Sequence, residues 1–327
     1  MDKGLTNNRV EIIDYLKGIS IILILLNHTI YKYDEIYAHY WIYQAVPVFL
    51  LVQVFHANRA FQNGKTTLKK WFSLKSILKI IKRIFIPFIV VQLIWTVVFL
   101  CKGEIPWGVI EGGHGPGSYY VWIYLQYWLI IPFFILMKNK YGNRVCLIVG
   151  LVLSILEEII CCYFFDYLPF HGMLYRMFMG RYLFLIPLGL LFFSFPIKLS
   201  PLKILLSIIS VVFIYIERYT EIDMTPFFYA SSWKGFHWLA YFYTAFVFVF
   251  ILQWLFNHTH KINKYVNLLG QCSYEIYIVQ MLVLGLLWNW RGDSLILDIL
   301  VFMVKIIVSI VPALIYKRLK DIICINK

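Results

Sequence analysis

The sequence predicts an all-α fold, a bundle of about ten transmembrane helices with both termini in the cytoplasm. Three observations predict it: the composition, the lengths of the apolar segments, and the distribution of positive charge between them. Of the 327 residues, 61% are hydrophobic and only 14% are charged, against roughly 45–50% and about 25% in soluble domains. Because a soluble core cannot cover this much apolar surface, we expect lipid to be the solvent for most of the chain.

Ten apolar segments approach the length of about 20 residues that a helix needs to cross a bilayer. The seventh is the shortest, and polar residues interrupt the ninth. The first has no small-residue cleavage site and is expected to act as an uncleaved signal anchor. We predict that residues 1–327 form one membrane domain, with helices near 13–31, 41–61, 84–101, 119–137, 145–165, 178–195, 202–217, 236–256, 269–289 and 296–316.

Positive charge alternates between the connections, which predicts an even number of spans with the N-terminus inside. The net charge of +13 is then expected to face anionic lipid rather than nucleic acid. The connections on the expected cytoplasmic side contain Lys3, Arg9, Lys65, Lys69, Lys70, Lys75, Lys79, Lys82, Arg83, Lys138, Lys140, Arg144, Lys198, Lys203, Lys261, Lys264, Lys317, Arg318, Lys320 and Lys327. The opposite connections contain Asp34, Glu35, Glu104, Glu111, Asp166, Glu221, Asp223 and Asp293.

The six cysteines predict no metal site. They show neither a CxxC pair nor a Cys/His spacing typical of metal ligands. We expect them to fill apolar space as small side chains.

The first helix carries the most informative polar residues, Lys17 and His28. They are eleven residues apart, which places them on nearly the same face of a helix with a rise of about 16 Å between them. Asp14 lies three residues before Lys17 and can pair with it. A histidine inside a membrane has two interpretations: a general base, because its unperturbed pKa is near 6.5, or a hydrogen-bonding group that joins helices.

Other polar residues in apolar segments are further candidates, because titratable groups in a bilayer are expensive to bury. Glu157 and Glu158 are adjacent, so at most one can point into a common site. Arg181 opens the sixth segment and departs from the charge pattern, which indicates a partner or an anionic ligand. The connection from Glu111 to Tyr120 contains four glycines around His114 and is followed by Trp122; the aromatic residues fit either carbohydrate stacking or an interfacial belt.

The residues also resemble a known family, the acyltransferase family 3 membrane proteins. The resemblance begins with Lys17 and His28, which match the family's cation, ten residues and histidine. It continues through residues 46–49 (VPVF), Arg83 with the following residues to Phe88, residues 120–122 (YVW) and residues 269–280 (LGQCSYEIYIVQ). Three positions depart from the family pattern. The Ser-Gly that often follows residues 46–49 is replaced around Gln53 and Val54. Ile80 stands where a first arginine is common, so that Lys79 or Lys82 would replace it, and Gln280 stands where histidine is frequent.

The resemblance implies a membrane-only O-acyltransferase of the bacterial inner membrane, without a permanently bound cofactor. It implies acetyl-CoA or another acyl-CoA as donor and a hydroxyl of a surface or exported polysaccharide, or of its lipid-linked precursor, as acceptor. His28 would be the general base or an acyl carrier. Lys17, Lys82 and Arg83 would bind the donor, and the acceptor side would include Glu157, Glu158, Arg181, Trp122 and His114.

Two other functions are compatible with the same residues. A transporter or flippase would move a polysaccharide precursor or an acyl donor without chemistry, although no internal repeat of the kind found in many transporters is visible. A structural or regulatory membrane protein would have to retain His28, Glu157, Glu158 and Lys305 in lipid without using them, which is costly.

Overall fold

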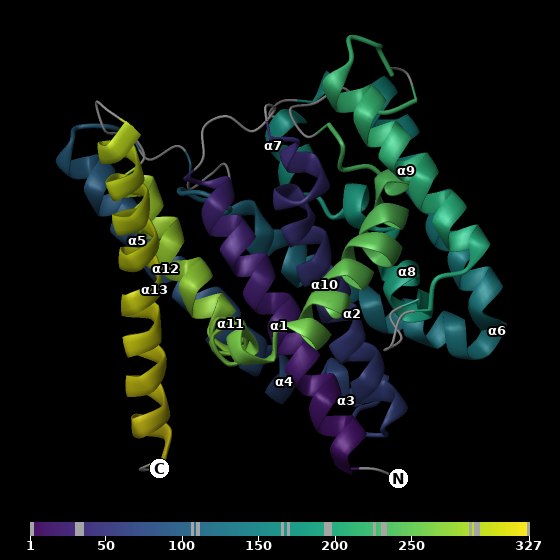
Figure 1. The fold of residues 1–327 in the computed structure, drawn as a ribbon, viewed down its shortest axis with the longest axis horizontal. Helices are drawn as coiled ribbons and strands as arrows, with labels where there is room; N and C mark the ends of the chain where they lie inside the picture. Colours follow the sequence, from purple (N-terminus) through teal and green to yellow (C-terminus); the bar gives the residue numbers. More distant parts are fainter. Residues whose placement is uncertain are drawn as a thin grey trace.

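A computed structural model describes residues 3–29, 36–105, 108, 112–164, 167–168, 171–192, 198–224, 227–229, 234–287, 290 and 295–325. Of the acids in the predicted outer connections, Asp34, Glu35, Glu111, Asp166 and Asp293 lie outside this part of the chain. Within it the structure is helical and contains no strand, as predicted. The long helices stand side by side, with α1 (Lys3–Asn27) crossing the middle of the view in Figure 1.

All ten predicted segments coincide with helical structure. The other helices are α2 (Ala45–Gln62), α3 (Leu68–Trp71), α4 (Leu74–Ile80), α5 (Ile86–Cys101), α6 (Tyr119–Phe164), α7 (His171–Met177), α8 (Leu185–Phe192), α9 (Pro201–Tyr219), α10 (Val249–His258), α11 (His260–Gln271), α12 (Ser273–Leu286) and α13 (Leu295–Ile325). Turns of π-helix precede α5 (Ile81–Phe85) and α10 (Tyr243–Phe248).

Several of these helices are long and apolar enough to cross a membrane, which makes the chain a membrane protein. In the described part there are five such stretches, or six if the bent pair α11 and α12 is one span. Helix α1 is not among the five, because Glu11, Asp14 and Lys17 make its first half polar. The count of about ten spans therefore stays a prediction.

Helix α6 is a hairpin of two helices, which corresponds to the separate fourth and fifth predicted segments. At Gly142 the backbone leaves the helical region, with φ 84° and ψ 174°. Beyond it the chain doubles back, because the Sγ atom of Cys146 lies 3.8 Å from the carbonyl oxygen of Phe134. In a straight helix, residues twelve apart would be separated by about 18 Å.

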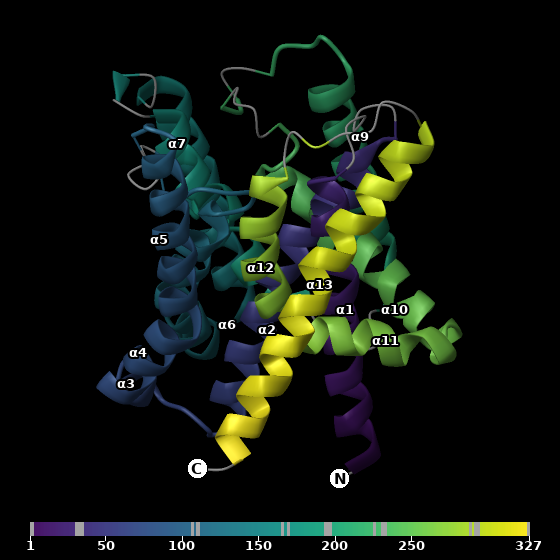
Figure 2. The ribbon, with the colours of Figure 1, turned by 90° about the vertical axis from the view of Figure 1, so that its left-hand side faces the viewer.

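Helix α11 lies across α1, and two glycines permit this close approach. A Cβ atom on Gly270 would lie 1.7 Å from the carbonyl oxygen of Asp14, and one on Gly18 would lie 2.0 Å from that of Val266. After Cys272 the chain turns by 69° into α12. The bend falls within the ninth predicted segment, near the polar residues that interrupt it. Figure 2 shows α11 crossing α1.

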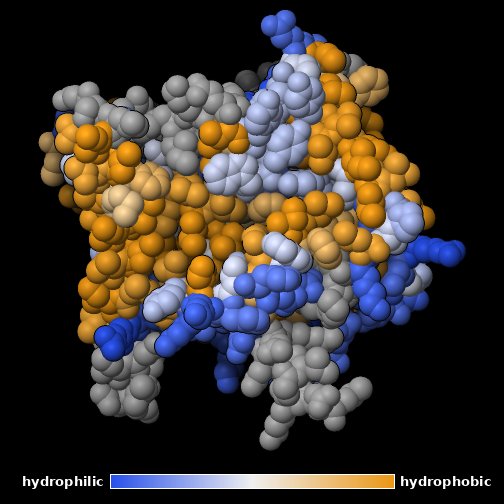
Figure 3. Space-filling model, viewed as in Figure 1, coloured by the Kyte–Doolittle hydropathy of each residue, from blue (hydrophilic) through white to orange (hydrophobic). Residues whose placement is uncertain are grey.

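One face of the molecule combines a large apolar area with a hydrophilic rim. The face in Figure 3 is hydrophobic over much of its area, with a hydrophilic rim along its lower edge, the end from which α1 begins in Figure 1, and a weakly hydrophilic area in its upper centre. Helix α13 ends at this same end (Figures 1 and 2), so the described ends of the chain lie on one side of the molecule. This arrangement is the one that an even number of membrane crossings would give.

Candidate functional site

A glycine-rich loop, residues 112–118, enters the bundle between α5, α6 and α12. Four of its residues have positive φ: Gly112, Gly113, Gly115 and Gly117. At Gly115 no other residue would fit, because a Cβ atom would lie 2.4 Å from the carbonyl oxygen of Met281 in α12. Irregular backbone is expensive in a membrane unless its polar groups find partners within the protein.

Side chains from three helices supply those partners. Gln92 in α5 accepts a hydrogen bond from the backbone N–H of His114 at 2.6 Å and donates to its carbonyl oxygen at 3.2 Å. Trp122 in α6 donates from Nε1 to the carbonyl oxygen of Gly112 at 2.6 Å. In α12, the hydroxyl of Tyr277 donates to the carbonyl oxygen of Gly117 at 2.8 Å and Nε2 of Gln280 donates to that of Pro116 at 3.2 Å. The loop is therefore a fixed part of the site.

One cavity lies on the side of this loop that is nearer the start of α1. This Lys17 cavity has a volume of about 570 Å³, within the range of small-molecule pockets. Polar and cationic groups make up part of its lining, and apolar and aromatic groups make up the rest. Its lining includes Lys17, Ile24, Gln53, His56, Trp71, Lys79, Arg83, Tyr120, Trp128 and Tyr277.

Three cations from three elements line the Lys17 cavity. Lys17 comes from α1, and its Nζ pairs with Oδ1 of Asp14 at 2.6 Å, as predicted. Lys79 ends α4, and Arg83 lies in the π-helical turn Ile81–Phe85. Side chains four residues apart lie on nearly the same face of a helix. Lys79 therefore lines the cavity together with Arg83, whereas Lys82, the predicted donor ligand, is not among the lining residues.

A second cavity lies on the other side of the loop and contains His28. This His28 cavity has a volume of about 500 Å³. His28 follows the last turn of α1, and its backbone N–H donates to the carbonyl oxygens of Ile24 and Leu25. The residues that line the cavity include His28, Trp95, Phe99, Lys102, His114, Gly117, Tyr119, Arg176 and Gly285.

The two cavities share a thin partition at Gly117. A Cβ atom on this glycine would lie 3.9 Å from Nε2 of His28 and 3.3 Å from the ring of Tyr277. The ring of Tyr277 packs edge-on against that of Tyr120 at 5.6 Å, and both belong to the Lys17 cavity. Ile24, which also lines that cavity, precedes His28 by one helical turn. A group bound in the Lys17 cavity beside Ile24 and Tyr277 would therefore lie near the imidazole in the other cavity.

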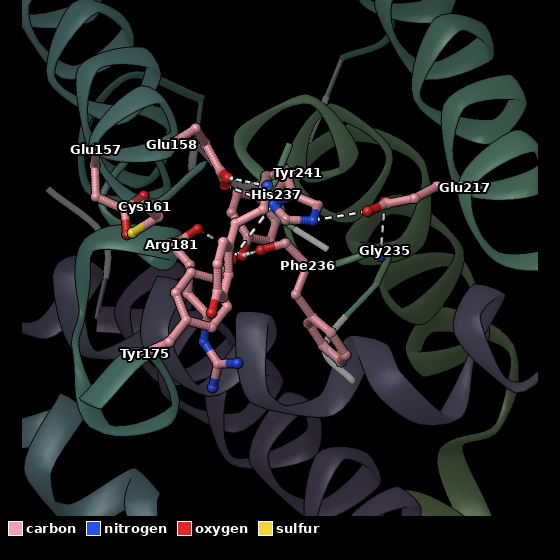
Figure 4. A network of polar contacts seen from close by, with 11 residues as sticks. Glu157, Glu158, Cys161, Tyr175, Arg181, Glu217, Gly235, Phe236, His237 and Tyr241 are labelled. Atoms are coloured by element: carbon pink, nitrogen blue, oxygen red, sulfur yellow. Dashed lines mark hydrogen bonds and ion pairs between the residues drawn. The ribbon is translucent and has the colours of Figure 1, made fainter. Parts of the chain in front are cut away.

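Glu157 and Glu158 point to different partners, as expected for adjacent residues of a helix, and neither lines the His28 cavity. Glu158 belongs to a buried triad with His237 and Glu217 (Figure 4). Nδ1 of His237 lies 2.5 Å from Glu158, and Nε2 lies 2.7 Å from Glu217. Glu157 instead accepts a hydrogen bond from Sγ of Cys161 at 3.4 Å. The sequence did not indicate the triad, because its members come from segments far apart in the chain.

Both carboxylates of the triad also bind backbone. Glu158 accepts a hydrogen bond from the N–H of Tyr229 at 3.1 Å, and Glu217 accepts one from the N–H of Gly235 at 2.7 Å. Tyr175 in α7 packs beside the triad, where burial, together with the nearby Glu158, raises the pKa of its phenol well above the usual value. Through these contacts the triad connects α6, α9 and the segment before α10.

Arg181 has partners, as its position in the sequence indicated. The side chain is almost completely buried. Its guanidinium lies over the rings of Tyr182, Tyr119 and Tyr175 at 4.6, 5.4 and 5.6 Å, and it donates to the carbonyl oxygen of Arg176 at 3.2 Å. Arg181 thus supports the wall of the His28 cavity from behind Tyr119.

Of the predicted acceptor-side residues, His114 alone lies in the wall of the His28 cavity. Trp122 supports the loop, and Arg181 supports the wall. Sequence reasoning missed Arg176 and Lys102, which also line the cavity. The sequence could have indicated both residues, because each is a cation in a connection on the predicted outer side, where the charge pattern leaves few cations.

Comparison with known proteins identifies the family. A family profile described as an acyltransferase domain matches residues 10–318. No curated protein and no solved structure gave a match. Within the described residues, no group of three or more His, Cys, Asp or Glu side chains is arranged to hold a metal ion.

Proposed function

The chain belongs to acyltransferase family 3, and from this membership we propose that it is a membrane O-acyltransferase using cytoplasmic acetyl-CoA or a similar acyl-CoA. The acceptor is a hydroxyl of a cell-surface or exported polysaccharide, or of its lipid-linked precursor. One observation carries the proposal: a cationic cavity and a histidine cavity meet at Gly117, beside Nε2 of His28.

The Lys17 cavity is the proposed donor site. Lys17, Lys79 and Arg83 line it, and such cations suit the phosphates of a nucleotide thioester. Trp71 and Trp128 add stacked rings at 5.8 Å, which suit an adenine base. The part beside Ile24 and Tyr277 would receive the pantetheine arm and bring the thioester to the partition.

His28 is the proposed general base. It would take the proton of the acceptor hydroxyl while that oxygen attacks the thioester carbonyl carbon, and the thiolate of CoA would leave and be protonated. Direct transfer and an acyl-histidine intermediate make the same demand on geometry, because both need the thioester within reach of Nε2. The closeness of that atom to Gly117 in the partition supports either route.

The bacterial inner membrane, with the N-terminus in the cytoplasm, is the proposed location. The alternating lysines and arginines support this orientation, as does the hydrophilic rim at the end where α1 begins. In this orientation the Lys17 cavity would be open to the cytoplasmic pool of acyl-CoA.

Labelled acetyl-CoA tests the function directly. Membranes containing the protein should convert the label into a base-labile ester on saccharide, and membranes containing His28→Ala at equal abundance should not. A transporter or flippase would leave the label as thioester in both. Recovery of saccharide ester from the His28→Ala membranes would overturn the assignment of His28.

A further inference from the structure

The His28 cavity differs from the Lys17 cavity in having no acidic group in its described lining. His28, Lys102, His114 and Arg176 line it, and among the described lining residues there is no acidic side chain. The Lys17 cavity, in contrast, includes Glu275 among its cations. A wall built only from bases in a site of low dielectric favours a ligand that brings negative charge.

Arg176 is oriented toward such a ligand by the groups around it. Its guanidinium lies 5.3 Å from the centre of the Tyr119 ring, and its Nη2 lies 3.4 Å from Oγ of Ser118. Arg181 lies 5.4 Å from the centre of the same ring. A planar guanidinium binds carboxylate and phosphate through paired hydrogen bonds.

Aromatic rings form another part of the lining of the His28 cavity. The rings of Phe99 and His114 stack with centroids 4.4 Å apart, and Trp95 lies 5.8 Å from Phe99. Trp95 is 6% exposed, and within the described part of the chain its Nε1–H has no hydrogen-bond partner. A flat apolar surface beside an unused buried donor suits a sugar ring, which offers C–H groups on its face and hydroxyl oxygens at its edge.

We propose that the acceptor is an anionic saccharide, with a carboxylate or phosphate held by Arg176 and Lys102 while the hydroxyl to be acylated faces His28. This inference rests on the proposed function and specifies its acceptor. The step remains balanced: the acceptor oxygen forms a bond to the acyl carbon, the bond from that carbon to sulfur breaks, and the hydroxyl proton passes through His28 to the thiolate of CoA. The anion takes no part in the reaction and fixes the sugar in place.

The native product tests this directly. Membranes of the cell that carries the protein would be given acetyl-CoA with a deuterated acetyl group, and the saccharide would be cut into oligosaccharides. Tandem mass spectrometry would then locate the deuterated ester, and we expect it on a residue that carries a carboxylate or a phosphate, which the masses distinguish. An ester on a neutral residue would overturn the inference and leave the acyltransferase function intact. Absence of any ester would overturn the function itself.

Variants separate anion binding from a structural role. In Arg176→Gln we expect the KM for the saccharide to rise at least ~10-fold, as loss of a charge-assisted hydrogen bond would give, with the KM for acetyl-CoA unchanged. Arg176→Lys should restore part of the loss. Lys102→Gln, at an exposed position of the wall, should also raise the KM for the saccharide. This variant serves as the test if Arg176→Gln does not fold. Lys140→Gln, at an exposed position near the break in α6, removes one cation outside both cavities and serves as the control.

Ionic strength adds a second measurement. Salt should raise the saccharide KM of the unaltered protein and have a smaller effect on Arg176→Gln, because screening acts on the interaction that the variant lacks. Equal salt dependence in both proteins, or a change confined to kcat, would contradict the proposal.

Discussion

Two histidines of this chain occupy opposite surroundings. His237 is completely buried, and carboxylates contact both of its ring nitrogens at 2.5 and 2.7 Å. His28 is partly exposed to a cavity of about 500 Å³ and lies near cations and aromatic rings. His237 is therefore committed to the triad, whereas His28 borders space that a substrate can enter.

The comparison teaches that burial and strong ion pairs do not by themselves identify a catalytic group. His237 forms short contacts with two buried carboxylates. The second oxygen of each carboxylate, however, accepts a hydrogen bond from a backbone N–H, at Tyr229 or at Gly235. Such a network fixes chain segments in place. A catalytic base needs an accessible nitrogen and a neighbouring site for the reacting carbon. In the proposed mechanism His28 meets both needs, because it lines a cavity and its Nε2 lies beside the partition at Gly117.

The largest expected effect is that of His28→Ala on acyl transfer. We expect kcat/KM to fall about 10²–10⁴-fold, the usual contribution of a positioned general base, while the midpoint of thermal unfolding changes little. His258→Ala is the matched control, because this histidine is exposed at the end of α10. The assignment would fail if the His28 and His258 variants had equal activity per folded molecule.

His237→Ala should show the opposite pattern. Removing one partner from a buried ionic network costs about 3–5 kcal/mol, because Glu158 and Glu217 are left facing one another. We expect a marked drop in the thermal midpoint of the purified protein in detergent, with acyl transfer per folded molecule retained at low temperature. A stable His237→Ala protein without activity would place the triad in the chemistry and remove the distinction drawn above.

Replacing the cations of the Lys17 cavity should affect donor affinity to a smaller extent. Hydrogen bonds to charged groups contribute about 1.5–3 kcal/mol, so we expect Arg83→Gln and Lys79→Gln each to raise the KM for acetyl-CoA about 10-fold or more. Lys82→Gln removes the same charge from a residue that does not line the cavity and should leave that KM nearly unchanged. Steady-state kinetics at saturating saccharide would measure this, and an equal effect of Lys82→Gln would show that overall charge, not contact, attracts the donor.

Much of the fold could be predicted from the sequence, because hydropathy and charge act over local stretches. The pairing of Lys17 with Asp14, the separate halves of α6 and the interruption near Cys272 follow from spacing and polarity along one segment. The break at Gly142 lies in the predicted connection between the fourth and fifth segments, so the hairpin agrees with the pattern of apolar and cationic residues.

The site was only partly predictable, because much of it depends on contacts between segments that are distant in the sequence. His28 and Arg83 stand out locally, but Arg176 and Lys102 gain their meaning from a cavity built by distant segments. Lys79 rather than Lys82 lines the Lys17 cavity with Arg83, which agrees with the four-residue spacing of side chains on one helix face; that signal was present in the sequence. The triad, however, unites Glu158, Glu217 and His237 across 79 residues of chain.

The smallest expected effect concerns the partition between the two cavities. Gly117 has φ +83°, and a Cβ atom there would lie 3.3 Å from the ring of Tyr277. Gly64 has φ +64° with nothing within 4 Å of the same position. Alanine at either site must adopt a left-handed conformation, which costs about 1–2 kcal/mol. The backbone part of the stability loss should therefore be comparable, and Gly117→Ala should lose more in total because of its contact with Tyr277.

The two alanine variants should differ in activity. Gly117→Ala pushes Tyr277 away from its hydrogen bond to residue 117 and brings a methyl group near Nε2 of His28, so we expect acyl transfer to fall severalfold. Gly64→Ala should transfer acyl groups at the normal rate per folded molecule. Thermal unfolding and initial rates on the same preparations would measure both quantities. Equal rates in the two variants would mean that the acyl group passes to His28 by a route that does not touch the partition, and that the meeting of the cavities at Gly117 is incidental to transfer.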